Sequence, residues 1–102
     1  MGSVLIPSAG RPAAEVQAAL EARGLVLHSW GNGPGDTYGW HDHPYHKTLV
    51  CLQGSIVFHT DDGDVGMTPG DVLELAPGTR HAATVGPTGV RCAEAAETPA
   101  SG

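Results

Sequence analysis

The chain has 102 residues, 40% of them hydrophobic, which suits one small domain with one core. Eleven acidic residues against five basic ones give a formal net charge of −6, which argues against nucleic acid or an anionic membrane as a partner. We expect no membrane span and no signal peptide, because no apolar run has the required length. The sequence therefore predicts a cytoplasmic protein with a single domain over residues 1–102, in which Cys51 and Cys92 are reduced thiols.

One helix is predicted near the N-terminus, over residues 12–23. Pro12 suits the first helical turn and Gly24 follows as a stop signal. Val16 and Leu20 lie four residues apart and so share one face of this helix. We expect that face to pack against the outside of a sheet.

From Gly24 onward, short apolar runs alternate with turns that are rich in glycine and proline. This pattern predicts strands over residues 25–30, 48–52, 55–60, 65–68, 72–76, 82–85 and 90–95. Residues 32–39 are predicted as a loop, Gln53-Gly54 as a hairpin turn, residues 86–89 as a further turn, and residues 97–102 as a flexible tail. Many short strands at this spacing indicate an all-β sandwich or a barrel-like jelly roll.

Histidines form the strongest candidate site. His41 and His43 are two residues apart, so both imidazoles face the same side of an extended strand. His81 comes from a later strand, behind the Pro77-Gly78 turn. Three imidazoles from two strands are a plausible ligand set for a transition metal, with positions left open for water and substrate. The alternative is that they are the polar lining of a metal-free pocket.

The spacing around these histidines resembles the two sequence motifs of the cupin superfamily. The first motif corresponds to Gly35, five residues, His41, His43, three residues, Lys47, six residues and Gly54. The second corresponds to Gly70, five residues, Ala76, Gly78, two residues, His81, three residues and Val85. The chain departs from the family pattern at Lys47, where a glutamate is usual, at Ala76 (usually proline) and at Val85 (usually asparagine).

The resemblance covers about residues 26–94 and implies a small cupin-like jelly-roll β-barrel with one short N-terminal α-helix. It also implies that His41, His43 and His81 hold a divalent transition metal, which could be Fe, Mn, Ni, Zn or Cu. Small cupins commonly pair, so the resemblance implies a homodimer. A chain this short would also gain stability by burying an edge strand or an apolar sheet face against a copy of itself.

Lys47 is expected on the inward face of its strand, because it lies four residues after His43. An ammonium group repels a metal cation and donates hydrogen bonds rather than accepting them. Three arrangements stay open. Lys47 turns away and pairs with an acid; or it binds a carboxylate or phosphate of a substrate beside the metal; or no metal binds, and Lys47 forms a cationic pocket with the histidines.

Further candidates surround the first motif. His46 is a possible fourth ligand if Pro44 breaks the strand register, and otherwise faces away from His43. The nearby aromatic residues are candidates for stacking on a ligand, or alternatively for filling the end of the core; they are Trp30, Tyr38, Trp40 and Tyr45.

Two functions follow from these observations. The first is a metal-binding cupin that acts on a small, anionic organic molecule, as an oxygenase or an isomerase. The alternative is a non-catalytic module that binds or senses a small ligand, with or without metal. The absence of the usual glutamate favours the alternative, because that residue is the acidic ligand of the family. Fold class alone does not decide between them.

Overall fold

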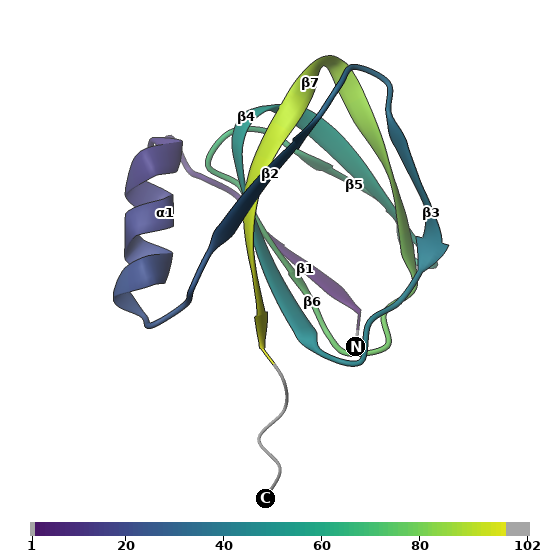
Figure 1. Cartoon of the computed structure of the whole chain (residues 1–102), viewed down its shortest axis with the longest axis horizontal. Coiled ribbons are helices and arrows are strands. Elements are labelled where there is room, and N and C mark those ends of the chain that lie inside the picture. The colour runs from purple at the N-terminus through teal and green to yellow at the C-terminus, as the bar shows by residue number, and fades with distance from the viewer. Residues whose placement is uncertain (1, 98–102) are drawn as a thin grey trace, which may run out of the picture.

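Residues 2–97 are described in the computed structural model of the chain, and they form one helix and seven strands (Figure 1). In chain order these elements are β1 (Ser3–Ile6), α1 (Ala13–Ala22), β2 (His28–Asn32), β3 (Thr37–His41), β4 (His46–Thr60), β5 (Gly63–Met67), β6 (Val72–Leu75) and β7 (His81–Glu97). The predicted helix is confirmed. Of the predicted tail, Glu97 ends β7 and the remaining residues lie outside the described part of the chain.

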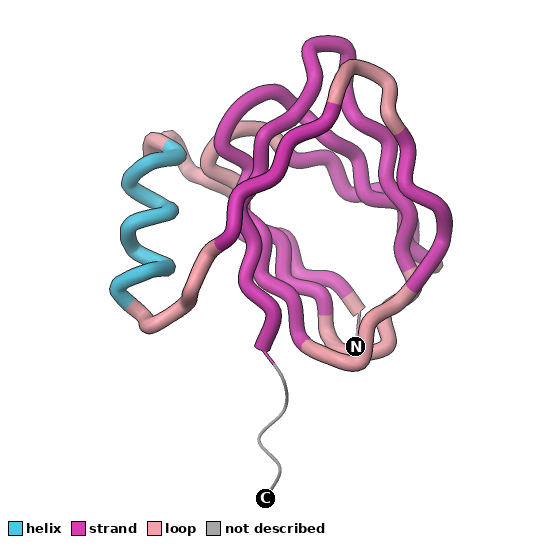
Figure 2. The backbone as a smooth tube through the Cα atoms, viewed as in Figure 1, coloured by secondary structure: helices cyan, strands magenta, loops and turns pink. Residues whose placement is uncertain are grey.

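The strands form one antiparallel sheet with the order β1-β6-β4-β7-β2. In addition, β3 pairs with β7, and β5 pairs with β4. The sheet curls into a barrel, and α1 lies on its outside (Figure 2). This arrangement confirms the predicted all-β jelly-roll barrel with a short N-terminal helix. Across residues 2–97, no helix combines the length and apolar character needed to span a bilayer.

The hairpin predicted at Gln53-Gly54 is wrong, because β4 runs through both residues. On either side of Gly54, β4 pairs with β7, and the register shifts between Cys51 and Gln53 and again between Gly54 and Ile56. Gly54 has a φ of +74°, and a Cβ atom there would lie 1.9 Å from the carbonyl oxygen of Gly89. Glycine therefore marks a bulge where two long strands bend together, rather than a turn between two strands.

Three further differences concern strand limits. The predicted turn at residues 86–89 is a bend within β7, which arches over the top of the barrel in Figure 1. Part of the predicted loop at residues 32–39 is strand, because β3 begins at Thr37 and pairs with Thr84 of β7. The strand β1 was not predicted, and it pairs with β6 from Ser3 opposite Leu75 to Ile6 opposite Val72.

Two apolar clusters lie on opposite faces of the sheet. The helix packs on the outer face, where Val16 and Leu20 meet Val50 of β4, as the sequence predicted. The inner cluster fills the barrel and contains Leu49, Cys51, Ile56, Phe58, Met67, Leu73, Leu75, Ala83, Val85, Val90 and Cys92. The cysteines are free, buried and opposite one another on β4 and β7. Side chains at the open end of this interior form the candidate site.

Candidate metal centre

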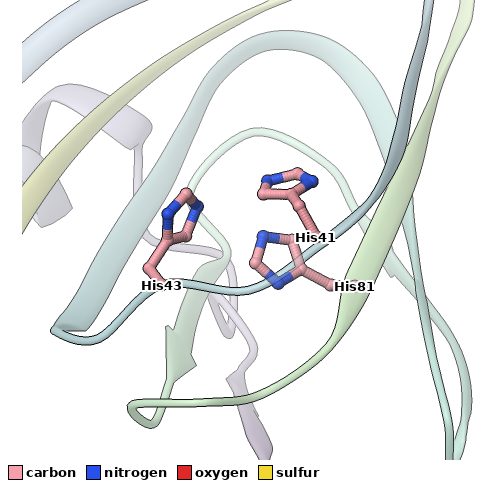
Figure 3. A group of neighbouring side chains, drawn as sticks. All are labelled: His41, His43 and His81. Atoms are coloured by element: carbon pink, nitrogen blue, oxygen red, sulfur yellow. The ribbon is translucent and has the colours of Figure 1, made fainter.

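His41, His43 and His81 converge at the open end of the barrel, as the sequence predicted from their spacing (Figure 3). His41 ends β3, His43 follows in the segment that leads to β4, and His81 begins β7. One ring nitrogen from each histidine lies within 4.8 Å of the others. His81 is 3% exposed, whereas His41 is the most exposed of the three. The group thus extends from the barrel interior towards solvent.

The three rings are each held through the nitrogen that points away from the group. The Nδ1 atom of His41 lies 2.6 Å from the carbonyl oxygen of Gly39, and that of His81 lies 2.8 Å from the carbonyl oxygen of Thr79. Both therefore carry their proton on Nδ1, which leaves Nε2 as an acceptor. The Nδ1 atom of His43 lies 3.1 Å from the Tyr45 hydroxyl group. This support, which fixes the tautomer and the ring orientation, is typical of histidines that bind metals.

The donor set fits a divalent transition ion. Metal–imidazole bonds of about 2.1 Å place neighbouring ligand nitrogens about 3–4 Å apart, and here the three nitrogens lie within 4.8 Å of one another. Burial, followed by the positive charge of Lys47, lowers the pKa of His43. Burial also lowers the pKa of His81, although its hydrogen bond to Thr79 opposes this shift. Both shifts favour neutral imidazole, the form that binds metal.

Lys47 lines the cavity and pairs there with an acid, without turning away from the histidines. Its Nζ atom lies 3.2 Å from Oε2 of Glu94 and 3.5 Å from Nε2 of His43. Glu94 is on β7, the neighbouring strand, and its other oxygen, Oε1, accepts a hydrogen bond of 2.7 Å from the indole nitrogen of Trp30. The site therefore contains a carboxylate, that of Glu94. It comes from β7 and lies beside Lys47, whereas the usual glutamate of the family would stand at position 47 itself.

A cavity of about 250 Å³ opens beside the histidines. Its wall combines the three imidazoles and the Lys47–Glu94 pair with aromatic and aliphatic side chains. The lining residues are Trp30, Tyr38, His41, His43, Lys47, Leu49, Phe58, His81, Ala83 and Glu94. Tyr38 packs edge-on against Trp30 and donates a hydrogen bond to Asn32, and burial raises its pKa. A mainly apolar wall with a few convergent polar groups is typical of sites for small organic ligands.

Not every residue suggested by the sequence lies in this cavity. His46 is outside the histidine group, and its Nε2 atom lies 3.0 Å from Oε1 of Glu74. Trp40 is 49% exposed, away from the cavity lining, with the Arg80 guanidinium 5.1 Å from its ring centroid. Tyr45 stacks on His43 and supports it instead of lining the cavity. Of the four aromatic candidates, Trp30 and Tyr38 line the cavity.

Glu94 was not predicted from the sequence as a site residue, and Trp30 was predicted only as an aromatic that stacks on a ligand or fills the end of the core, not as the partner of Glu94. Strand parity could have identified Glu94, because it lies two residues after Cys92, which faces the barrel interior. An acidic residue among alanines at positions 93, 95 and 96 is also unusual for a strand with a buried face. The link to Trp30 depends on the pairing of β2 with β7, which the sequence does not specify.

Comparison with known proteins agrees with this description. The family model for the cupin domain matches residues 31–91, which include His41, His43 and His81. A curated relative, quercetin 2,3-dioxygenase of Bacillus subtilis (strain 168), is 34% identical over 68 residues, or 65% of this chain. The match spans 20% of that enzyme's length.

Solved structures show the same fold. A cupin superfamily protein from Desulfitobacterium hafniense DCB-2 matches with a TM-score of 0.66 and 19% identity, over 72% of this chain and 66% of the other. A DUF861 family protein from Thermotoga maritima matches with a TM-score of 0.64 and 17% identity, over 92% of this chain and 98% of the other. With the motifs, the barrel and the family match in agreement, the chain belongs to the cupin family.

Proposed function

We propose that this protein is a metal-binding cupin that takes a small organic molecule into the cavity beside His41, His43 and His81. The observation that carries the proposal is the convergence of three ring nitrogens within 4.8 Å, with Nδ1 of each ring in a hydrogen bond. Three neutral ligands leave coordination positions open for water or for an oxygen atom of the organic molecule. A bound divalent ion would supply a Lewis acid to polarise that oxygen.

The protein's own residues would bind and orient the organic molecule. Trp30, Tyr38 and Phe58 provide aromatic surface in the cavity wall, and the Phe58 ring lies beside His81, with ring centroids 6.2 Å apart. The sequence suggested an anionic molecule, on the assumption that Lys47 offers a free positive charge. Because the Lys47 ammonium group is paired with Glu94, an anion would depend mainly on the charge of the bound metal.

For the reaction class we propose an oxygenase before an isomerase. The support is the similarity to the Bacillus subtilis quercetin 2,3-dioxygenase, which is 34% identical over 68 residues. The test is oxygen consumption by protein reconstituted with Fe, Mn, Ni, Cu or Zn, against a panel of hydroxylated and carboxylated aromatic compounds. Metal- and substrate-dependent oxygen uptake that is lost in His41→Ala/His43→Ala would support the proposal. Substrate binding without turnover by any metal form would contradict it.

One observation favours the second candidate, a non-catalytic ligand-binding module. The Lys47 ammonium group lies 3.5 Å from Nε2 of His43, so a cation already stands close to one of the metal-binding nitrogens. A module of this kind would bind the organic molecule equally well with and without metal. Measuring ligand affinity before and after chelation separates the two functions.

We further propose that the protein is a cytoplasmic homodimer that joins through β1. This strand lies at the end of the sheet order and carries three exposed apolar residues, Val4, Leu5 and Ile6. A second copy could continue the sheet at this edge and cover these side chains. Light scattering after size-exclusion chromatography should give twice the chain mass of 10.4 kDa. A mass equal to one chain at all concentrations would contradict the dimer.

A further inference from the structure

The Lys47–Glu94 pair is the main feature of the cavity that metal binding does not explain. Glu94 contributes both carboxylate oxygens to contacts within the cavity, one with the Trp30 indole and one with the Lys47 ammonium group. The side chain of Lys47 is 12% exposed and that of Glu94 is 25% exposed. Among residues 2–97, Glu94 is the one acidic side chain in the lining of this cavity.

We propose that Glu94 determines which charge a ligand can carry in this cavity. Beside the Lys47–Glu94 pair, the cavity would bind an uncharged hydroxyl group of the ligand in preference to a carboxylate. The inference rests on the proposed function, since it assumes that this cavity holds the organic ligand. It names the ligand class more closely than the cupin fold does: an uncharged molecule with a hydroxyl group on a compact apolar body. Glu94 is thereby assigned as a specificity-determining residue.

Charge is the first reason for this preference. An ammonium group and a carboxylate 3.2 Å apart form a nearly neutral unit in a partly desolvated wall, where charges interact more strongly than in water. A ligand carboxylate that approaches Lys47 meets the negative charge of Glu94 beside it. It must either tolerate that repulsion or displace Glu94 from both of its partners. Either outcome costs free energy that an uncharged group avoids.

Hydrogen-bonding capacity is the second reason. Lys47 has three N–H donors, and Glu94 has lone pairs beyond the two that accept from Trp30 and Lys47. The pair therefore presents a donor beside an acceptor. A hydroxyl group can accept from Lys47 and donate to Glu94 at the same time, whereas a carboxylate can only accept. The apolar side chains of Leu49, Phe58 and Ala83 line the rest of this wall and suit the carbon body of the ligand.

Trp30 provides a direct reporter for the experiment, because its indole nitrogen donates to Glu94. The chain has two tryptophans, so Trp40→Phe leaves Trp30 as the fluorophore. In this background we would titrate two probes that share a ring and differ in the polar group, benzyl alcohol and benzoate. Affinities from Trp30 fluorescence would be measured on the protein as purified and again after chelation.

The expected result is that the starting protein, after chelation, binds benzyl alcohol more tightly than benzoate. Glu94→Gln keeps the shape of the side chain and removes its charge, so it should reverse this order, with benzoate binding about tenfold more tightly than before. Glu74→Gln is the matched control, because Glu74 pairs with His46 outside the cavity. That variant changes the net charge equally and should leave the probe order unchanged.

A second variant guards against misfolding of Glu94→Gln. Lys47→Met removes the positive partner and leaves the carboxylate, so benzoate should bind more weakly still, while benzyl alcohol loses one hydrogen bond. The proposal is overturned if the chelated starting protein prefers benzoate, if neither variant shifts the ratio of the two affinities, or if no form binds either probe. Metal content, measured separately, tests the proposed metal site. The two proposals can therefore fail independently. A protein that binds no metal can still show the reversed order of benzyl alcohol and benzoate in Glu94→Gln, and a metal-loaded protein can fail to show it.

Discussion

His41 and His81 are paired residues of neighbouring strands: their Cα atoms are register partners between β3 and β7, and their ring centroids lie 4.3 Å apart. A register shift separates this pair from the Tyr38–Ala83 pair. The irregularity allows Tyr38 and His41 both to face the cavity, although three positions separate them along the strand. The site thus depends on backbone geometry as well as on the identity of its residues.

Gly54 is expected to be intolerant of any side chain. Gly54→Ala would place a methyl group 1.9 Å from the Gly89 carbonyl oxygen, at a φ of +74°. We predict a loss of at least about 2 kcal/mol in the free energy of unfolding, from the clash and the strained backbone together. Urea denaturation measures it. Gly39→Ala is the control, because a Cβ atom at Gly39 meets nothing within 4 Å; equal stability of both variants would contradict the account of the β4–β7 bend.

Leu73 on β6 is expected to contribute more to the free energy of unfolding than Leu5 on the edge strand β1. It is 0% exposed and belongs to the inner cluster, so Leu73→Ala should destabilise the protein by about 2–5 kcal/mol. Leu5→Ala removes the same atoms from β1, where the side chain is 37% exposed in the single chain, and should cost less than half as much when the protein is diluted until it is monomeric. Thermal unfolding of the two variants compares them directly. Similar losses would mean that β1 is covered by a partner.

Exchanging the charges of Lys47 and Glu94 tests whether the pair is structural. Lys47→Glu alone places two carboxylates together and should destabilise the protein by about 1–3 kcal/mol. Adding Glu94→Lys should recover most of that loss, and the carboxylate at position 47 should tighten metal binding by about tenfold. Unfolding and metal titrations give both quantities. Failure of the second substitution to recover stability would show that the two side chains do not interact.

Stability of the metal-free protein should fall in mild acid. The pKa values of His43 and His81 are lowered in the folded state, chiefly by burial, so the unfolded chain binds protons first as the pH drops. Their contribution is fully present above the unfolded pKa of about 6.5 and is lost as the pH falls through the lowered folded values. Urea midpoints at a series of pH values measure this.

A variant separates these histidines from other acid-sensitive groups. His43→Gln removes one of the two and should flatten the fall in stability below about pH 6.5. His28→Gln, a change at an exposed position on β2, should not flatten it. An identical pH profile for all three proteins would contradict the assignment.

Local patterns were sufficient to predict the fold class and the histidine group. Residue spacing placed His41 and His43 on one face, and glycine and proline marked most strand ends. The hairpin at Gln53-Gly54 was mispredicted because a glycine at positive φ serves equally well in a turn and in a bulge. What decides between them is whether both flanking segments pair with the same strand, and that partner, β7, lies about 40 residues away.

The partner of Lys47 could not be predicted for a related reason. Its inward orientation followed from strand parity, but its neighbour across the sheet depends on the β4–β7 register, which two bulges shift. Trp40 was suggested by its closeness to the first motif, but beyond the register shift within β3 it is exposed and lies against Arg80. Periodicity therefore predicts side-chain faces well in regular strands and poorly beyond a bulge.

The central claim is that His41, His43 and His81 together hold one divalent metal ion. The most direct test is elemental analysis of untagged protein, stripped with a chelator and then dialysed against Fe, Mn, Ni, Zn or Cu. We predict about one ion per chain for the starting protein and for His46→Ala, whose side chain pairs with Glu74 outside the group, and none for His41→Ala/His43→Ala. Full metal content in the double variant, or none in the starting protein, would contradict the account.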